Sequence, residues 1–498
     1  MTCDQPDHFI LREGRALIGF KSLSGAPGIS APGMTIDGEI AYGPGDLRVI
    51  NPATEEPFLE VPAAEIAQLD RAVRAARKAT AQWRIRSSAD RQDLVRKFGS
   101  TILEHIDELA LMLTLEQGKP LADSVAEIRY GVKYCNSFAA IDIPTEMVRD
   151  APSELVEVRH APVGVVGAIT PWNYPVMLAL WKIAPALLAG NPVILKPSPF
   201  TPVTTLRMGE LAADVFPAAV LQVLSGDDNL GKALAIHDGI DKIAFTGSSS
   251  AGRSVMRAAA HTLKRLTLEL GGNDAAIVLE DADPQAVAEE IVLAAMVNGG
   301  QACTAIKRLY LPERRFQEHA EALSAAAARI VVGNGLEPGV TMGPVQNGHQ
   351  KARIDSLLST SVARGATTLF AGRVPLGAGY FHPVTLLHCT EDDLPMVAQE
   401  QFGPVLPVLT YRDTDEAVAR ANTSPFALGA SVWSTDELRA ELVADDLEAG
   451  TVWINQHSVL SPDVPFGGIK QSGIGVESGR DGLMEYTNVR VRRIRRHP

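Results

Sequence analysis

Residues 193–279 of this 498-residue chain alternate between short apolar segments and amphipathic segments, and no other feature constrains the fold as strongly. The apolar segments predict buried strands, and the amphipathic ones predict helices, because their apolar residues recur at helical spacing. Single helices between strands give parallel βαβ units with right-handed crossovers. We therefore expect an α/β fold with a doubly wound parallel sheet, whose ligands bind beyond the carboxyl ends of the strands. The predicted strands are 193–196, 221–224, 242–245, 265–270 and 275–279, and the predicted helices are 204–215, 230–237 and 251–261.

The flanking segments extend this pattern in both directions. On the amino-terminal side, helical spacing predicts three amphipathic helices, followed by an exposed strand that leads into a buried one. On the carboxyl-terminal side, a looser alternation predicts a second α/β unit. The expected helices are 64–84, 88–107, 120–139, 284–298, 313–331 and 347–364, and the expected strands are 155–169, 307–311, 406–410 and 452–454. Residues 23–33, which are rich in Gly, Pro and Ser, predict that residues 1–33 form a flexible amino-terminal extension.

Charge and cysteine content disfavour several classes of function. The chain has 59 acidic residues against 46 Lys and Arg, a net charge of −13, which makes nucleic acid and anionic membranes poor partners. Its four cysteines are too few for a disulfide framework or a cysteine-rich zinc site. We therefore expect a cytoplasmic protein without a bound metal. Residues 176–195 are apolar but contain Lys182 and Pro185, so they predict a buried helix and strand rather than a membrane span.

Two polar turns follow predicted strands, at the edge where a ligand is expected. The segment Thr246-Gly-Ser opens a helix whose free N–H groups would suit a phosphate, although a plain strand-to-helix turn explains the same residues. It matches neither the three-glycine dinucleotide fingerprint nor a P-loop. Lys196 would donate to a ribose hydroxyl or a phosphate, or it would be a surface lysine. Spacing alone leaves both pairs of alternatives open.

Three further residues are candidates for catalysis. Cys303 follows a glycine pair, which predicts a tight turn with an accessible, activated thiolate, whereas a lone cysteine is more often buried and inert. Glu269 lies between leucines at the end of a predicted strand, where burial would raise its pKa and suit a general base, unless it forms a structural ion pair. Asn173 precedes a helix, either as its N-cap or as an amide donor to a developing oxyanion.

Seven segments, in one order along the chain, resemble the motifs of the aldehyde dehydrogenase superfamily. The resemblance runs from about residue 34 to the carboxyl terminus, and Asn51-Pro-Ala-Thr is similar to the family's amino-terminal signature. Seven ordered motifs make a chance match negligible. The segments are Pro171-Trp-Asn-Tyr-Pro, Lys196-Pro-Ser, Phe245-Thr-Gly-Ser, Leu268-Glu-Leu-Gly-Gly, Gly300-Gln-Ala-Cys, Glu400-Gln-Phe-Gly-Pro and Pro465-Phe-Gly-Gly-Ile-Lys-Gln-Ser-Gly.

The resemblance implies catalytic roles for the three candidates. Cys303 would be the nucleophile, Glu269 the general base, and Asn173, with the backbone N–H of Cys303, the oxyanion hole. In that chemistry Cys303 attacks an aldehyde, hydride passes to NAD(P)+, and the resulting thioester is hydrolysed to a carboxylic acid. The alternatives are a CoA-acylating relative, which generally lacks the equivalent of Glu269, and a family member without catalytic activity.

The resemblance also implies which residues bind the cofactor and the substrate. Many relatives carry a glutamate where this chain has Pro199, and that glutamate disfavours a 2'-phosphate, so we expect NAD with NADP possible. The substrate residues are mostly apolar and predict an uncharged aliphatic or aromatic aldehyde, although Met177 and Trp181 could equally be core residues. The implied cofactor residues are Trp172, Lys196, Ser198, Pro199, Gly226, Thr246, Gly247, Ser248, Leu270, Glu400 and Phe402. The implied substrate residues are Met177, Trp181, Ala302, Thr304, His457 and Phe466, and Arg308 is implied to be structural.

The family fold further implies a division into domains and an oligomer. Residues 34–144 and 163–270 would form a Rossmann-like NAD(P)-binding domain, and residues 271–475 an α/β catalytic domain. Residues 145–162 and 476–498 would form a small β oligomerisation element. A homodimer or homotetramer is the expected assembly.

Overall fold

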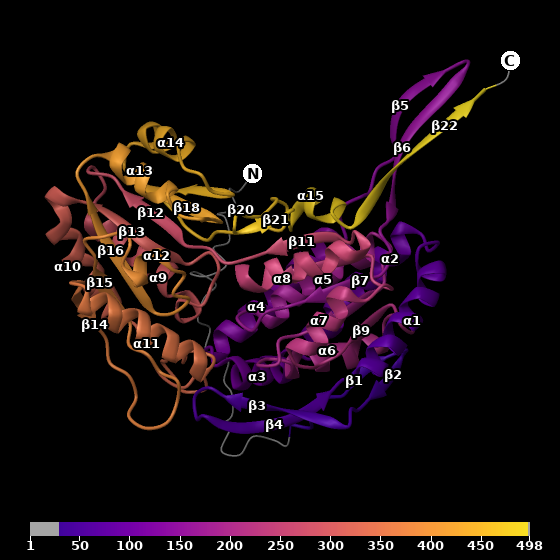
Figure 1. Cartoon of the computed structure of the whole chain (residues 1–498), viewed down its shortest axis with the longest axis horizontal. Coiled ribbons are helices and arrows are strands. Elements are labelled where there is room, and N and C mark those ends of the chain that lie inside the picture. Colours follow the sequence, from indigo (N-terminus) through magenta and orange to yellow (C-terminus); the bar gives the residue numbers. More distant parts are fainter. Residues whose placement is uncertain (1–28, 497–498) are drawn as a thin grey trace.

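The computed structural model describes residues 29–496, which form two lobes and a projecting arm (Figure 1). The indigo and magenta lobe contains the first half of the chain, and the orange lobe contains most of the second half. The predicted amino-terminal extension, residues 1–33, lies outside the described residues except for 29–33, where the Gly33 N–H donates to Glu210. Among residues 29–496, no helix is long and apolar enough to cross a lipid bilayer.

An eight-stranded sheet forms the centre of the first lobe, in the order β2-β1-β9-β8-β7-β10-β11-β21. Strands β9, β8, β7, β10 and β11 are parallel. From β7 the chain builds outward through β8 and β9, then crosses to the other side and adds β10 and β11. The order therefore reverses between β7 and β10, as in a doubly wound sheet, and the predicted fold class is confirmed. The strands are β1 (Met34–Ile36), β2 (Glu39–Ala41), β7 (Val166–Ile169), β8 (Val193–Lys196), β9 (Leu221–Val223), β10 (Lys242–Thr246), β11 (Arg265–Glu269) and β21 (Gly473–Ile474).

The helices of the first lobe follow the predicted pattern with one correction. The single helix predicted at 88–107 ends early, at Glu104, and a separate helix follows it. His105, with φ −109° and ψ 18°, interrupts the helical backbone, and the acidic pair Asp107 and Glu108 favours the start of the new helix. The helices are α1 (Ile66–Trp83), α2 (Ser88–Glu104), α3 (Ile106–Gln117), α4 (Leu121–Phe138), α5 (Pro175–Leu188), α6 (Val203–Ala213), α7 (Asp228–Ile236), α8 (Ser249–Ala259) and the short η1 (Ala260–Thr262).

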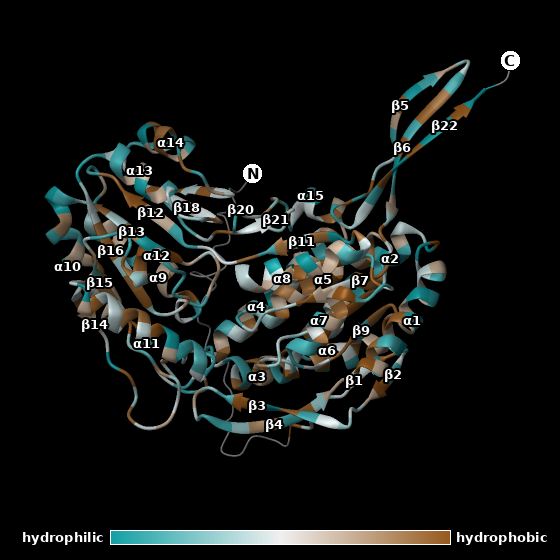
Figure 2. Ribbon diagram, in the orientation of Figure 1, coloured by the Kyte–Doolittle hydropathy of each residue, from teal (hydrophilic) through white to brown (hydrophobic). Residues whose placement is uncertain are grey.

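Helix α5 is buried over its whole length, as predicted for the apolar stretch that includes Lys182. Pro175 occupies its first turn, where the missing N–H costs no helical hydrogen bond. Figure 2 shows hydrophobic colour along this helix and along the strands inside both lobes. The core of the first lobe therefore surrounds α5, and residues carried by its first turns can be held rigidly.

The second lobe is built on a seven-stranded sheet in the order β14-β15-β16-β13-β12-β18-β19. All neighbours are parallel except β14 and β15, so the predicted second α/β unit is confirmed. The strands are β12 (Asp274–Val278), β13 (Ile306–Pro312), β14 (Thr367–Ala371), β15 (Thr385–His388), β16 (Val405–Tyr411), β18 (Gly429–Trp433) and β19 (Thr451–Ile454). The helices are α9 (Pro284–Met296), η2 (Val297–Gly300), η3 (Glu313–Arg315), α10 (Phe316–Ala327), α11 (Gly348–Ala363), α12 (Pro395–Ala398), α13 (Thr414–Asn422) and α14 (Glu437–Asp445).

The end of the chain returns from the second lobe to the first and then enters the arm. Strand β21 pairs with β11, and α15 (Gly479–Met484) lies against α4 and α5. The arm itself is a three-stranded antiparallel sheet, β5-β6-β22, which extends away from both lobes (Figure 1). Its strands are β5 (Glu146–Ala151), β6 (Glu154–Pro162) and β22 (Thr487–Arg495). Two further two-stranded antiparallel sheets pair β3 (Gly45–Asn51) with β4 (Glu56–Ala63) and β17 (Phe426–Ala427) with β20 (Ile469–Lys470).

Candidate active site

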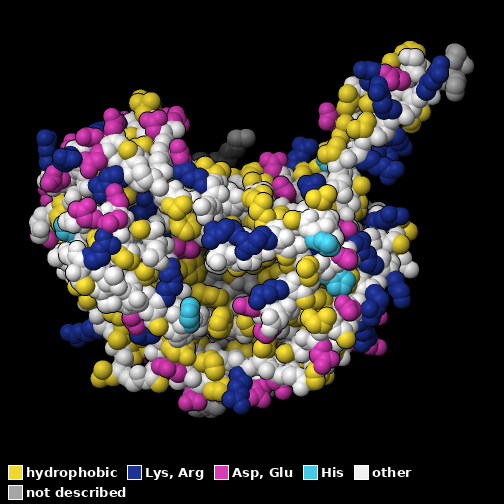
Figure 3. Space-filling view, viewed as in Figure 1, with side chains coloured by type: hydrophobic (Ala, Val, Ile, Leu, Met, Phe, Trp, Pro, Cys, Tyr) yellow, Lys and Arg dark blue, Asp and Glu magenta, His cyan; other side chains and the backbone are white. Residues whose placement is uncertain are grey.

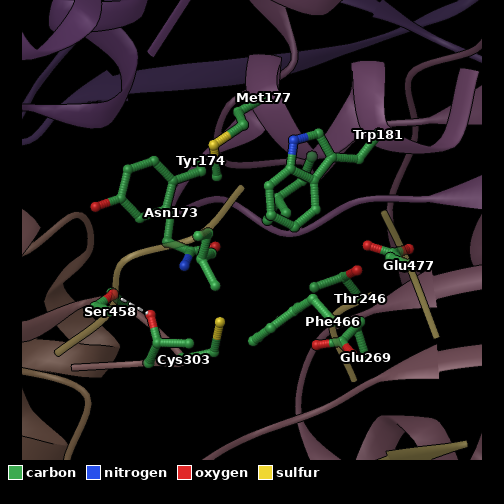
Figure 4. A pocket seen from close by; sticks show the side chains of 14 residues that line it. Asn173, Tyr174, Met177, Trp181, Thr246, Glu269, Cys303, Ser458, Phe466 and Glu477 are labelled. Carbon is green, nitrogen blue, oxygen red and sulfur yellow. Dashed lines mark hydrogen bonds between the residues drawn. The ribbon is translucent and has the colours of Figure 1, made fainter. Parts of the chain in front are cut away.

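A cavity lies where the two lobes meet, and it brings together residues from distant parts of the sequence. Figure 3 shows the surface hollowed between the lobes, and Figure 4 shows the side chains that line the cavity. The first lobe contributes the turn after β7, helix α5 and the ends of β10 and β11. The lining residues are Asn173, Tyr174, Met177, Leu178, Trp181, Thr246, Glu269, Ala302, Cys303, Thr304, Ser458, Leu460, Phe466 and Glu477.

Cys303 enters the cavity from a turn of three left-handed residues, two of which are glycines. Asn298, Gly299 and Gly300 have positive φ angles of 50°, 65° and 70°, a left-handed conformation that glycine adopts at least cost. A side chain at Gly300 would also collide with the carbonyl oxygen of Gly403. The glycine pair therefore turns the chain sharply just before the nucleophile candidate, as the sequence predicted.

Lys307 holds the backbone of this turn through hydrogen bonds. Its Nζ donates to the carbonyl oxygens of Ala302, at 2.8 Å, and Cys303, at 2.6 Å, and it lies 3.8 Å from Glu400 Oε1. Lys307 was not predicted as a site residue. It lies in strand β13, whose residues are all buried, and a buried lysine indicates a structural or functional role because it needs polar partners.

The thiol of Cys303 holds its proton tightly. Burial, and secondarily the nearby Glu269, raise the pKa of Cys303 to about 12, while Lys307 acts in the opposite direction. This corrects the expectation of an activated thiolate, although the expected accessibility is found in part, because the Cys303 side chain is partly exposed. An attack by sulfur therefore requires a group that accepts the proton as the bond forms.

Glu269 ends β11 and faces the same cavity, as Figure 4 shows. Its Oε1 has no hydrogen-bond partner, although the side chain is buried. Burial raises its pKa well above the ordinary value, Glu477 raises it further, and Lys182 opposes the shift. The predicted upward shift is thus found, and a carboxyl group with a raised pKa is suited to proton transfer near neutral pH.

Two other charged residues beside Glu269 were missed from the sequence. Lys182 Nζ, on buried α5, donates to Thr246 Oγ1 at 2.6 Å and forms an ion pair with Glu477. Residues 182 and 477 are 295 positions apart, so no local pattern links them. The signal was again a single lysine in an otherwise apolar helix.

Asn173 does not cap α5. The helix begins at Pro175, and its N-cap residue is Tyr174. The Asn173 Nδ2 donates to the carbonyl oxygen of Gln301 at 3.0 Å, two residues before Cys303. Its second N–H is left for another acceptor, and the residue lines the cavity with Cys303 (Figure 4).

The residues at the carboxyl edge of the first sheet fit a dinucleotide. Lys196 ends β8, is buried, and donates to the neighbouring carbonyl of Pro197 at 3.1 Å, which leaves further N–H groups for a ligand. Burial lowers its pKa to about 8, and Asp228 and Asp227 oppose this. Ser248 caps α8 by accepting from the Ala251 N–H, so the start of that helix lies at the same edge.

The remaining predicted cofactor residues lie along the same edge or across the cleft. Pro199 and Ser198 follow Lys196, Gly226 follows β9, and Thr246 and Gly247 follow Phe245 at the end of β10. Leu270 packs against Gly252 of α8. From the second lobe, Glu400 Oε1 accepts from the Gly272 N–H at 3.0 Å, and the Phe402 ring meets the Trp172 ring edge-on, with centroids 5.3 Å apart.

Five of the six predicted substrate residues line the cavity: Met177, Trp181, Ala302, Thr304 and Phe466. His457 is not among the lining residues, and its contact with substrate stays a prediction. Its ring is buried outside the lining, where Nε2 lies 2.9 Å from the Thr304 carbonyl and 3.7 Å from Asp274 Oδ2. The neighbouring Ser458 takes the expected place and shares a hydrogen bond with Thr304. Arg308 is structural, as expected, since it donates to the carbonyls of Asn273 and Ala421.

Comparisons with known proteins agree with this geometry. A model of the aldehyde dehydrogenase family matches residues 42–491. A phenylacetaldehyde dehydrogenase from Pseudomonas fluorescens is 38% identical over 96% of this chain and 98% of its own length. The crystal structure of a betaine aldehyde dehydrogenase from Staphylococcus aureus in complex with NAD+ superposes with a TM-score of 0.90, at 33% identity, and covers 94% of this chain and 95% of that one. An aldehyde dehydrogenase from Bacillus cereus gives a TM-score of 0.91 at 35% identity, with 94% and 97% covered.

Proposed function

This chain belongs to the aldehyde dehydrogenase family, and we propose that it oxidises an aldehyde to the carboxylic acid with NAD+ through Cys303, Glu269 and Asn173. One observation carries the proposal: the thiol of Cys303 and the carboxyl group of Glu269 line a single cavity, beside the carboxyl edge of the doubly wound sheet. That edge is where such sheets bind dinucleotides. The nucleophile, the base and the cofactor residues therefore adjoin one another.

The first step forms a bond between the Cys303 sulfur and the aldehyde carbon. Because burial raises the pKa of the thiol, its proton must leave as the bond forms, and we assign Glu269 as the acceptor. The aldehyde oxygen gains negative charge in this step. The free N–H of Asn173 and the backbone N–H of Cys303 would stabilise that charge, and losing one such donor costs about 100- to 1000-fold in rate.

The second half of the reaction removes the acyl group from sulfur. Bound NAD+ supplies the hydride acceptor, and loss of hydride leaves a thioester on Cys303. Once Glu269 has released the thiol proton to solvent, it takes a proton from water, whose oxygen attacks the thioester carbon. The C–S bond then breaks, the departing sulfur takes that proton back from Glu269, and the carboxylic acid is released. A buried carboxyl group in this place favours hydrolysis over transfer of the acyl group to CoA.

The residues at the cofactor edge are compatible with either NAD+ or NADP+. Lys196 would bind the adenosine ribose, Gly247 and Ser248 the pyrophosphate, and Glu400 the nicotinamide ribose. Pro199 supplies no carboxylate that would repel a 2'-phosphate, so NADP+ is not excluded. We propose NAD+ as the preferred cofactor because the betaine aldehyde dehydrogenase relative was crystallised in complex with NAD+.

The cavity lining favours an uncharged, apolar substrate. Its walls are formed largely by Tyr174, Met177, Trp181, Leu460 and Phe466, and no Lys or Arg is among the residues that line it. An aldehyde with a carboxylate would lose its hydration without gaining a counter-ion. We propose a neutral aryl or alkyl aldehyde, a class that includes the substrate named for the phenylacetaldehyde dehydrogenase relative.

An aldehyde panel with both cofactors tests these assignments. We expect NADH formation with phenylacetaldehyde and hexanal at a kcat/KM at least about tenfold above that with succinic semialdehyde or betaine aldehyde. Cys303→Ala should abolish NADH formation, whereas the matched variant Cys389→Ala, in the buried core of the second lobe, should retain it. Glu269→Gln should give one burst of NADH and an acyl-enzyme visible by mass spectrometry. Steady turnover by Cys303→Ala would reject the mechanism.

We also propose that the arm joins copies of this chain in a homo-oligomer. Its strands expose apolar side chains on an otherwise charged element, and Figure 3 shows them as yellow patches among blue ones. A sheet that extends into solvent with exposed valines and methionines is suited to pairing with another surface. The exposed apolar residues are Met147, Val148, Val489, Val491 and Ile494.

A further inference from the structure

A second buried ion pair lies behind the cavity, outside its lining. Lys119 follows Gly118, the left-handed residue that ends α3, and Glu127 lies on α4. Lys119 Nζ and Glu127 Oε2 are 2.5 Å apart, and both side chains are almost completely buried, at 2% and 0% exposed. The reaction proposed above uses neither residue, and removing two charges from water is costly unless each is well partnered.

Lys119 holds the main chain of Asn173. Its Nζ donates to the Asn173 carbonyl oxygen at 3.0 Å, and the same oxygen accepts from Asn298 Nδ2 at 3.0 Å. Asn298 belongs to the left-handed turn that precedes Cys303. One carbonyl group thus connects the buried lysine, the oxyanion donor and the turn of the nucleophile.

Glu127 holds the first turn of α5. Its Oε1 accepts from the backbone N–H groups of Val176, at 2.9 Å, and Met177, at 3.1 Å. These N–H groups lack partners within the helix, and the N-cap residue Tyr174 makes no capping hydrogen bond. A carboxylate at a helix N-terminus also interacts favourably with the helix dipole. Glu127 therefore caps, from another helix, the element that carries Met177 and Trp181 into the cavity.

The aromatic wall of the cavity is fixed by the same lysine. Lys119 Nζ lies 3.9 Å from the centre of the Tyr174 ring, a cation–π contact, and Tyr174 lines the cavity. The three N–H groups of the ammonium are thus accounted for by the Glu127 carboxylate, the Asn173 carbonyl and the ring. A fully satisfied polar cluster of this kind restricts its neighbours to one arrangement.

We infer that Lys119 and Glu127 are positioning residues for aldehyde oxidation: they set the oxyanion donor Asn173 and the start of α5 relative to Cys303 without touching substrate. The inference rests on the proposed role of Asn173. Misplacing a catalytic group by about 1 Å costs on the order of 100-fold in rate. Loss of the lysine should therefore slow the step in which charge develops on oxygen, and should leave cofactor binding unchanged.

A double-mutant cycle tests whether Lys119 acts through Asn173. The variants are Lys119→Met, Asn173→Ala and the double variant, and the readout is the single-turnover rate of NADH formation from phenylacetaldehyde. We expect Lys119→Met alone to lower this rate by about 10- to 100-fold, with the Kd for NAD+ within about twofold of wild type. In the Asn173→Ala background the same change should cost less than about threefold, because interacting residues are not additive.

The other possible outcomes separate the role of Lys119 from the role of Asn173. If the rate losses of the two single variants multiply in the double variant, the positioning role is rejected and the role of Asn173 stands. The same follows if Lys119→Met keeps the wild-type rate while Asn173→Ala is slow. An unimpaired Asn173→Ala would reject the oxyanion role of Asn173 under the proposed function, and the inference with it. Glu127→Gln keeps an oxygen for the Val176 and Met177 N–H groups but removes the charge. Glu127→Gln should lower the single-turnover rate by about 3- to 10-fold, and this loss should not add to that of Asn173→Ala. This variant replaces Lys119→Met in the test if Lys119→Met does not fold.

A control variant separates positioning from general destabilisation. Arg420 forms a partly buried ion pair with Asp392 in the second lobe, with its Nε 2.7 Å from Asp392 Oδ2, and neither residue lines the cavity. Arg420→Met should lower the thermal midpoint and leave the single-turnover rate within about twofold of wild type. If Arg420→Met slows the reaction as much as Lys119→Met does, the loss of rate reports lost stability and the inference fails.

Discussion

Buried titratable groups crowd the cavity, and each alters the protonation of its neighbours. Glu269 raises the pKa of Cys303, Glu477 raises that of Glu269, and Lys307 and Lys182 act against these shifts. The arrangement keeps a proton on the resting nucleophile. A resting thiol is also less exposed to oxidation and alkylation than a resting thiolate.

The pH dependence of alkylation checks this at residue 303. Because the pKa of the Cys303 thiol is about 12, the reactive thiolate is scarce at neutral pH and its fraction rises with pH up to that value. We expect the rate of labelling by iodoacetamide, measured on the Cys303 peptide by mass spectrometry without cofactor, to rise by about tenfold per pH unit from 7 to 10. A plateau near pH 8.5 would show an ordinary, solvated thiol.

The role of a single residue was predictable where the residue lies in a motif, and was not predictable where the role depends on contacts that the sequence does not show. Cys303, Glu269 and Asn173 lie in segments whose order indicated their roles, and the structure places all three at one cavity. Lys119 and Lys182 depend on partners in other elements, such as Glu477 for Lys182, which no local pattern reveals. Lys307 binds the carbonyl groups of the turn just before it, and only the conformation of that turn shows this. His457 lies outside the lining because the turn after β19 directs Ser458, its neighbour, into the cavity.

Among the elements, the turn η2 determines where the nucleophile lies. It places three left-handed residues in succession and is pinned by Gln301, whose Nε2 donates to the Asn298 carbonyl at 2.7 Å, and by Lys307. Gly299 has some freedom, since a side chain there would meet only the end of the Gln301 side chain closely. Gly300 has none, because the backbone of Gly403 lies against it.

Gly300→Ala should therefore be more damaging than left-handed backbone strain alone. Strain costs about 1–3 kcal/mol, and the collision with Gly403 adds to it and displaces Cys303. Gly365→Ala is the matched control, because Gly365 also has a positive φ, 107°, but has open space around it. We expect Gly365→Ala to lower only the thermal midpoint, and Gly300→Ala to lower the midpoint further and abolish NADH formation. Equal effects of the two variants would mean that the turn yields easily.

At this scale the sequence predicted regular elements well and interruptions poorly. The alternation over 193–279 predicted strands β8 to β12 within two residues, but β12 joins the sheet of the second lobe and not the doubly wound sheet. The break between α2 and α3 was missed, since His105 is neither Gly nor Pro and the apolar spacing continues across it. Short strands such as β14, β15 and β18 were missed too, because their pairing depends on distant segments and not on local composition.

The whole molecule places its chemistry between two lobes and its exposed apolar surface on the arm. The arm strands pair over their full length, with β22 matched to β6 from Thr487↔Pro162 to Arg495↔Glu154. This sheet packs against neither lobe in Figure 1, so its exposed valines have no partner within the described chain. The assembly and the domain boundaries inferred from sequence remain predictions.

Negative charge introduced on the exposed apolar face of the arm should dissociate the proposed homo-oligomer without unfolding its subunits. Val489 and Val491 are 67% and 58% exposed, so Asp at both positions costs little within the monomer but much in a shared interface. We expect this double variant to sediment as a smaller species than the wild type, with an unchanged circular dichroism spectrum. Val362→Asp, at an exposed valine on α11, should leave sedimentation unchanged. Sedimentation that is identical in all three proteins would place the contact elsewhere.

The return of the chain from the second lobe to β21 gives the order of synthesis a consequence. Strand β21 covers the edge of β11 at Glu269, and Glu477 follows it into the cavity. A ribosome-bound chain that has already made residue 303 still lacks both, since they are encoded more than 160 codons later. The reactive centre is thus completed only once residue 477 has been made, after every other residue that lines the cavity.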